Sequence, residues 1–325
     1  MVQRKRKKRS KLQLLFPLVL LILFAALTYR SINFIGRGLL LDENRRDKPR
    51  PAPTQKEVTA TAIPISFDNL YSPHAILVDL DDETILMQKK SDDKIYPASL
   101  TKMMTILVAI ENLDDFQEEI KLGHSMFENL TKADASIAGF QPGERVRAID
   151  LLYGAMLPSG AECSIGLADY IAGSESAFVK LMNEKAADLG MDNTHFANAT
   201  GLHKAKHVST VKDMSVLLCY ALQNDMFRKI FTAERYSTSP TNIHPDGITF
   251  YSTMFSKVSS QSISDGKILG GKTGFTREAG LCLASLAVQG GKEYILVTAG
   301  APGDHQSEQY NVTDAFSVYN SLVKK

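Results

Sequence analysis

The chain has 325 residues, of which 44% are hydrophobic, 21 are Gly and 12 are Pro, a composition that excludes a collagen-like or wholly disordered protein. Its 37 basic and 36 acidic residues nearly cancel, but they are unevenly distributed. From Ile65 onward, 32 acidic residues outnumber 23 basic ones, and this net charge of −9 argues against nucleic acid as a partner.

The first 64 residues divide into three segments by composition. Residues 1–11 contain seven basic residues and no acidic one, whereas residues 12–29 are uncharged and mostly apolar. A helix of that length spans about 27 Å, close to the ~30 Å hydrocarbon core of a bilayer. We therefore predict one membrane anchor at 12–29, with 1–11 in the cytoplasm and the rest of the chain outside it; the alternative is a cleaved signal peptide and a secreted protein. Residues 30–64 are predicted to be a linker, because the charged, Pro-bearing stretch 42–64 cannot bury enough apolar surface to fold.

Residues 65–325 are predicted to form a single folded domain. Two hairpins are expected near its ends, from the strand-like pairs 75–80 with 85–87 and 281–288 with 294–299. Apolar residues at helical spacing predict helices over 103–110, 151–156 and 210–223, and a closing helix over 316–323. Thr210 is the expected cap of the third helix, with Asp213 as its partner. This order predicts an α/β protein of the α+β kind, with one antiparallel sheet built from both chain ends and a helical subdomain inserted between them.

The first candidate for chemistry is Ser99 in the segment YPASLTKMM at 96–104. Pro97 and the apolar pattern that follows place Ser99 at a helix N-terminus, where unpaired N–H groups stabilise an oxyanion. Lys102 lies one turn later on the same face, as a serine nucleophile with a lysine base requires. Because S-x-x-K occurs five times in this chain, the motif alone favours an ordinary helix cap over a nucleophile.

Two further segments could contribute to a site. GGKTGF at 270–275 precedes a strand-like run, and its Lys272 and Thr273 suit the binding of a carboxylate; the alternative is a Gly-rich turn with an exposed lysine. LPSGAE at 157–162 breaks two apolar helices. Its Ser159 either faces a cleft and relays a proton or belongs to a plain interhelical turn.

In chain order, Ser99-x-x-Lys102, Ser159 and Lys272-Thr273-Gly274 resemble the motif set of the serine penicillin-binding protein and β-lactamase superfamily. The flanking sequences at 96–105, 157–160, 178–202 and 271–280 are similar to those of the low-molecular-mass D-alanyl-D-alanine carboxypeptidases, peptidase family S11. The resemblance covers about residues 65–325. It implies a β-lactamase/DD-peptidase-like fold, no metal or cofactor, a peptidoglycan stem peptide ending in D-Ala-D-Ala as substrate, and β-lactam antibiotics as covalent inhibitors.

The resemblance also implies a role for each matched residue. Ser99 would attack the carbonyl between the last two D-alanines, Lys102 would take its proton, and Ser159 would pass a proton to the leaving amine. Lys272 would keep Lys102 neutral and attract the terminal carboxylate, to which Thr273 would donate a hydrogen bond. The backbone N–H groups of Ser99 and of Phe275, the residue after Gly274, would form the oxyanion hole.

Two features depart from the family's pattern. Ala161 stands two residues after Ser159, where the family usually has an Asn that would bond the lysine and the substrate amide, a contact of about 1–3 kcal/mol. Glu162 is expected either to replace that Asn or to cap the following helix. No arginine near residues 303–305 is available for the terminal carboxylate, and Arg277 is the remaining candidate.

Other signals are weaker. His203 and His207 share the spacing of a metal pair but lie in a predicted loop, and the three cysteines are expected to be buried small hydrophobic residues rather than disulfide partners. A β-lactamase would need a Glu to activate the deacylating water, and none occurs around 192–198. The rival from another class is a β-lactam-binding sensor of the same fold that is acylated but turns over slowly.

Overall fold

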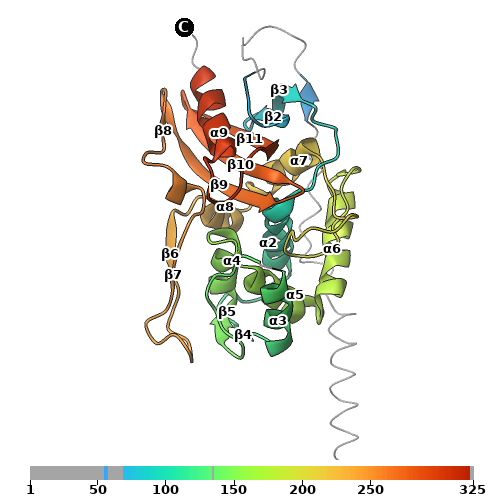
Figure 1. Cartoon of the computed structure of the whole chain (residues 1–325), viewed down its shortest axis with the longest axis vertical. Helices are drawn as coiled ribbons and strands as arrows, with labels where there is room; N and C mark the ends of the chain where they lie inside the picture. The colour runs from blue at the N-terminus through green and yellow to red at the C-terminus, as the bar shows by residue number, and fades with distance from the viewer. Residues whose placement is uncertain (1–54, 58–68, 134, 323–325) are drawn as a thin grey trace, which may run out of the picture. The chain divides into compact units, whose positions relative to one another are not determined.

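The computed structural model describes residues 55–57, 69–133 and 135–322 (Figure 1). The segments 1–11 and 12–29 lie outside these residues, as does most of the predicted linker 30–64. No helix within the described ranges has both the length and the apolar character needed to span a bilayer.

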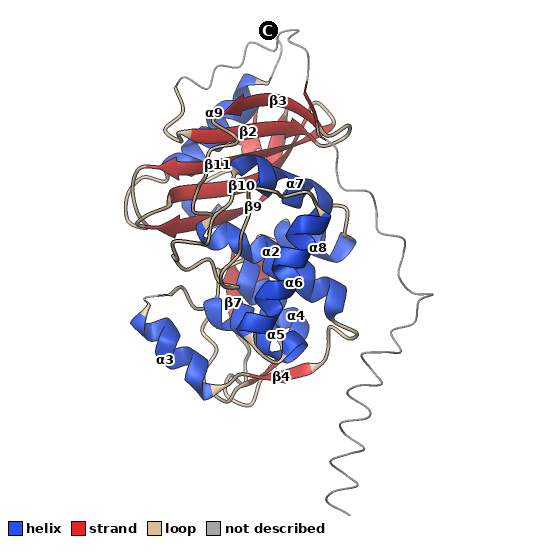
Figure 2. Ribbon diagram, turned by 90° about the vertical axis from the view of Figure 1, so that its right-hand side faces the viewer, coloured by secondary structure: helices blue, strands red, loops and turns tan. Residues whose placement is uncertain are grey.

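A seven-stranded sheet combines strands from both ends of the domain, in the spatial order β1-β3-β2-β11-β10-β9-β8. Figure 2 shows the central part of this order, from β3 to β9. All neighbouring pairs are antiparallel except β1 with β3. The strands are β1 (Lys56–Glu57), β2 (His74–Asp79), β3 (Thr84–Lys89), β8 (Ser262–Ile263), β9 (Gly266–Thr276), β10 (Gly280–Gln289) and β11 (Lys292–Ala301). The structure therefore confirms the predicted antiparallel sheet from both chain ends.

Both predicted hairpins are confirmed by the register. Val78 pairs with Ile85 in the first hairpin, and Leu286 pairs with Ile295 in the second. GGKTGF precedes the strand β10, as predicted, and itself lies within β9.

The linker prediction is wrong for two residues. Lys56 and Glu57 form β1 and pair with Thr84 and Ile85 of β3, while the side-chain amide of the preceding Gln55 donates to Ser215 Oγ at 2.9 Å. A strand at a sheet edge is held by backbone hydrogen bonds, which charged residues also form, so a polar composition does not exclude it.

The central strands bury side chains on both faces, since successive residues point to opposite sides. In β2, Ile76 and Val78 pack into a large core with the helical subdomain, whereas Leu77 packs against the other face with Val318 of the last helix. The sheet is therefore covered on both sides.

The helical elements fill the middle of the chain, as predicted. They are η1 (Ala98–Leu100), α2 (Thr101–Asn112), α3 (His124–Lys132), α4 (Ala148–Met156), α5 (Ala161–Ala172), α6 (Glu175–Asp188), α7 (Val211–Ala221), α8 (Asp225–Phe231), η2 (Phe255–Lys257) and α9 (Tyr310–Ser321). Two small antiparallel sheets of two strands each accompany them, β4 (Glu119–Lys121) with β5 (Arg145–Arg147) and β6 (Arg235–Ser237) with β7 (Thr249–Tyr251). Every residue of α2 from Thr101 to Ile110 is buried, so this helix forms the centre of the subdomain and carries Lys102 into the interior.

The cap predicted for α7 can be tested by stability measurements. Thr210 Oγ1 accepts the backbone N–H of Asp213 at 2.9 Å, so Thr210→Val, which keeps the shape but removes the hydroxyl, should lower the free energy of unfolding by about 1 kcal/mol. Urea denaturation measures the change. Thr210→Ser keeps the cap and is the control; an equal loss in both variants would show that packing, not capping, is responsible.

Candidate active site

Ser99 lies in η1, one turn of 3-10 helix that runs directly into α2. Ala98 has a φ of +47°, and Ser159, across the site, has a φ of +66°. Non-glycine residues in this left-handed region carry strain of about 1 kcal/mol or more and persist only where the surroundings hold them. Such strain is concentrated at functional sites. Here it lies at Ser159 itself and at Ala98, the residue before Ser99.

Two glycines allow backbone segments to approach this turn. Gly201 has a φ of +83°, and a Cβ there would collide with the carbonyl oxygen of Ala98. A Cβ on Gly274 of β9 would lie 3.1 Å from the Ser99 nitrogen. The loop before Gly201 and the strand after Lys272 therefore both pack directly against the nucleophile's turn.

Lys102 contacts Ser99 as the sequence predicts. Its Nζ donates to Ser99 Oγ at 3.0 Å and to the carbonyl oxygen of Thr200 at 2.7 Å. The residue is 2% exposed. Burial lowers the pKa of Lys102 to about 8, an effect that the charge of Glu162 partly opposes.

Lys272 and Ser159 form a second lysine–serine pair in the same site. Lys272 Nζ donates to Ser159 Oγ at 2.9 Å and to the carbonyl oxygen of Thr273 at 2.8 Å. Lys272 has no exposed surface. Burial, and then repulsion from Lys102, keep the pKa of Lys272 well below its usual value.

Burial is the first cause of both depressed lysine pKa values. Repulsion between the two amines adds to it and favours the state in which one of them is neutral. The expected role of Lys272, to keep Lys102 neutral, stays a prediction.

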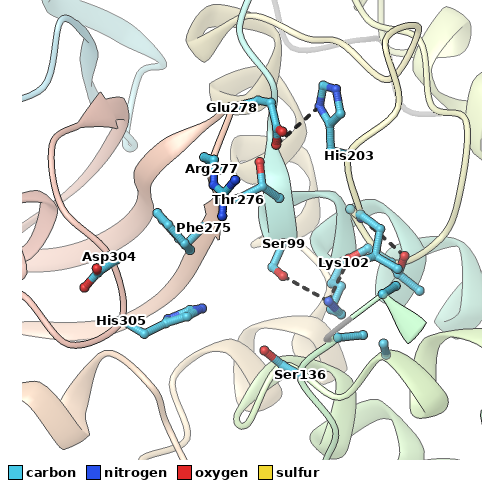
Figure 3. A pocket seen from close by; sticks show the side chains of 16 residues that line it. Ser99, Lys102, Ser136, His203, Phe275, Thr276, Arg277, Glu278, Asp304 and His305 are labelled. Carbon is cyan, nitrogen blue, oxygen red and sulfur yellow. Dashed lines mark hydrogen bonds and ion pairs between the residues drawn. The ribbon is translucent and has the colours of Figure 1, made fainter. Parts of the chain in front are cut away.

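A cleft of about 530 Å³ opens above Ser99 and Lys102, with Ala161 and Phe275 among its walls (Figure 3). A smaller hollow of about 100 Å³ adjoins it on the side of Thr273 and Ser159. Thr273 Oγ1 lies 2.6 Å from Thr253 Oγ1 in this hollow. The two spaces share Ser99, Ser136, Phe275 and His305, so they are two parts of one cleft that meet at the serine.

Ala161 and Glu162 open helix α5. Glu162 neither bonds Lys102 nor acts as the cap of α5: its Oε1 accepts the backbone N–H groups of Ala138 at 2.6 Å and Gly139 at 3.1 Å. Burial raises its pKa, and its Oε2 has no hydrogen-bond partner among the described residues. Glu162 thus holds the loop that carries Ser136. At the wall of the cleft, Ala161 presents only a methyl group.

Sequence reasoning missed the loop at 196–202, although its sequence FANATGL belongs to the resemblance. Asn198 Oδ1 accepts the N–H of Gly201 at 2.7 Å, and Asn198 Nδ2 donates to the carbonyl of Leu202 at 2.7 Å. These two hydrogen bonds hold the loop so that the Thr200 carbonyl faces Lys102. A pattern of side chains does not predict which backbone carbonyl accepts a hydrogen bond. The spacing of Asn198 and Gly201 was the only sequence feature that pointed to this loop.

His203 and His207 point to different partners. His207 accepts the N–H of Ala197 through Nδ1 at 3.0 Å, so its Nε2 carries the proton and donates to Thr101 Oγ1 at 2.7 Å. Burial lowers its pKa to about 4, which keeps the ring neutral. Within the described ranges, no group of three or more His, Cys, Asp or Glu residues is arranged to hold a metal ion. Cys163, Cys219 and Cys282 are free and buried, as predicted.

Comparisons with known proteins identify the family of this chain. Residues 57–303 match the D-alanyl-D-alanine carboxypeptidase family, Peptidase_S11. The chain is 33% identical over 257 residues to D-alanyl-D-alanine carboxypeptidase DacF of Bacillus subtilis and 32% identical over 237 residues to DacC of Escherichia coli. These alignments cover 76% and 70% of this chain but only 62% and 56% of the two relatives, so the chain spans about three-fifths of their length.

The crystal structure of the Streptomyces K15 DD-transpeptidase is similar in fold, with a TM-score of 0.70 at 25% sequence identity. The likeness covers 79% of this chain and 99% of that one. It confirms the DD-peptidase and β-lactamase-like fold expected from the sequence. By the family match and by its similarity to curated relatives, the chain belongs to the D-alanyl-D-alanine carboxypeptidase family, Peptidase_S11.

Proposed function

We propose that this protein is a penicillin-sensitive serine DD-carboxypeptidase that removes the terminal D-Ala from peptidoglycan stem pentapeptides. The observation that carries the proposal is the 3.0 Å hydrogen bond from Lys102 Nζ to Ser99 Oγ at the floor of the cleft. A lysine with a pKa of about 8 supplies a neutral amine near neutral pH, which is the base that a serine nucleophile needs. Membership of the family supports the same reaction.

Acylation begins when neutral Lys102 accepts the hydroxyl proton of Ser99. Ser99 Oγ then bonds to the carbonyl carbon of the penultimate D-Ala, and the negative charge that develops on the carbonyl oxygen is met by the N–H groups of Ser99 and Phe275. The C–N bond breaks as the leaving D-Ala takes a proton from Ser159, and the proton that Lys102 accepted passes to Ser159 and restores its hydroxyl. Ser159 Oγ accepts a hydrogen bond from Lys272, so its own hydroxyl hydrogen is free to point at the leaving amine. Water then hydrolyses the ester and returns a proton to Ser99.

The terminal carboxylate of the substrate would lie in the hollow beside Thr273. Lys272 cannot contact it directly, because this side chain is fully buried and both of its acceptors are protein atoms. Lys257 lines the same hollow and adds positive charge there, beside the ring of His305. Arg277 follows four residues after Thr273, about 13 Å along an extended strand, which places it away from this carboxylate.

The cell-wall substrate requires a catalytic domain outside the cytoplasm. The apolar segment 12–29 with its basic flank supports a single-pass anchor in the bacterial cytoplasmic membrane, or secretion if the segment is cleaved. β-Lactams would acylate Ser99 as substrate mimics.

The second candidate function is a β-lactam-binding sensor. Ala161 favours it, because the methyl group leaves Lys102 with two acceptors, Ser99 Oγ and the Thr200 carbonyl, and offers nothing to the substrate amide.

Two probes separate these functions. A pentapeptide ending in D-Ala-D-Ala should release D-Ala, and a labelled β-lactam should bind covalently; Ser99→Ala should abolish both signals, because both acylate the same oxygen. Release is measured by a D-amino-acid assay and labelling by gel fluorescence, with Ser91→Ala as the control variant. Labelling without release would support the sensor, and neither signal in the unmodified protein would contradict both.

The acylation rate should depend on the protonation of Lys102. Below a pKa of about 8, the neutral fraction falls about tenfold for each pH unit, so the rate constant for β-lactam labelling should rise with pH to about 8 and then level off. Stopped labelling reactions between about pH 6 and pH 9.5 measure this profile. A flat profile would rule out a neutral lysine as the base.

Restoring the missing amide should favour turnover. Ala161→Asn adds a donor and an acceptor to the cleft wall, and a contact of about 1.4 kcal/mol made in the transition state would raise kcat/KM for the pentapeptide about tenfold. Steady-state release of D-Ala measures the change. Ala161→Val, which adds volume without an amide, is the matched control; equal effects in both variants would show that the amide does not position the substrate.

A further inference from the structure

The wide part of the cleft ends in three charged or titratable side chains that the proposed reaction does not use. We call His203, Arg277 and Glu278 the cleft rim; all three line the 530 Å³ cleft (Figure 3). His203 Nδ1 lies 3.8 Å from Glu278 Oε2, and the His203 ring packs edge-on against Tyr96 at 4.6 Å. The rim thus joins the loop after Gly201 to the turn between β9 and β10.

Arg277 and Glu278 differ in how their charges are engaged. The guanidinium of Arg277 is exposed and makes no hydrogen bond or ion pair with a described residue. Glu278 is also exposed, and it faces His203 at 3.8 Å; backbone hydrogen bonding, then His203 and Arg277, lower its pKa. The rim therefore presents a carboxylate beside an exposed guanidinium, two adjacent groups of opposite charge.

The edge of β9 sets the direction in which a peptide substrate must run. β9 pairs with β10 along its length, but its other edge pairs with β8 only at Gly266 and Lys267, so the edge from 268 to 276 has no strand partner among the described residues. With the terminal carboxylate at Thr273 and the reacting carbonyl at Phe275, an extended peptide continues antiparallel to β9. Each residue advances about 3.3 Å, which brings the residue before the two D-alanines to Thr276 and Arg277.

We propose that the cleft rim recognises the side chain of the third stem-peptide residue, and that it fits a side chain ending in both a free carboxylate and an ammonium group, as in diaminopimelate. Arg277 would bind the carboxylate and Glu278 the ammonium. This inference rests on the proposed function. A third-residue lysine offers only the ammonium, and a diaminopimelate whose side-chain carboxylate is amidated would leave the guanidinium without its charged partner.

Three pentapeptides that differ only in the third residue test the proposal: free diaminopimelate, amidated diaminopimelate and lysine. The full chain in detergent should cleave the free diaminopimelate peptide with kcat/KM about tenfold above the other two. Arg277→Gln should remove this preference by lowering only the first value. Glu278→Gln should lower kcat/KM for all three peptides, since the third-residue side chain of each ends in an ammonium group. Arg235→Gln, at an exposed position on β6, is the matched control.

The outcomes are distinct. Equal rates for the three peptides in the unmodified protein would overturn the rim proposal and leave the proposed function intact. A uniform loss in Arg277→Gln would instead assign this arginine to a feature common to all the peptides, such as the terminal carboxylate, and would also overturn it. No D-Ala release from any peptide, with no β-lactam labelling, would overturn the proposed function and the rim assignment together.

Discussion

The burial of two lysine side chains determines how the rest of the cleft is built. Lys102 and Lys272 are 2% and 0% exposed, and neither has a carboxylate as a hydrogen-bond partner. A buried ammonium without partners costs several kcal/mol, so each lysine must be met by acceptors. Each lysine donates to one serine hydroxyl and one backbone carbonyl. The depressed pKa of each amine follows from this arrangement, since uncharged acceptors compensate for burial only in part.

A backbone carbonyl can serve as an acceptor only if the chain around it is held in place. For Lys272 the carbonyl belongs to the next residue of the same strand, and the sheet holds it. For Lys102 it belongs to a loop, which two side chains hold: the partly buried Glu175 accepts the N–H of Ala199 at 2.9 Å, and the buried Thr105 donates to the carbonyl of Ala199 at 2.7 Å. The requirement for a neutral base thus extends to side chains of α6 and α2 that do not line the cleft.

Local pattern predicted much of this structure, and the failures share one cause. The hairpins, the helices, the cap at Thr210 and the positions of Ser99 and Lys102 all depend on residues close together in sequence. The Lys272–Ser159 pair spans 113 residues and was not predicted, although the resemblance assigned both residues to one site. The Thr200 carbonyl, the loop contacts of Glu162 and the pairing of Lys56 with the sheet edge depend on backbone groups, which every residue has and which no composition distinguishes.

The free cysteines carry a practical consequence. All three are buried, and burial raises the pKa of each thiol, so none is prepared to react as a thiolate. The stability of the described fold comes from apolar packing and hydrogen bonds and owes nothing to covalent cross-links. Recombinant production therefore needs no oxidising compartment: the domain can be expressed in a reducing cytosol and purified with thiols present, and reductants will not change its active-site chemistry.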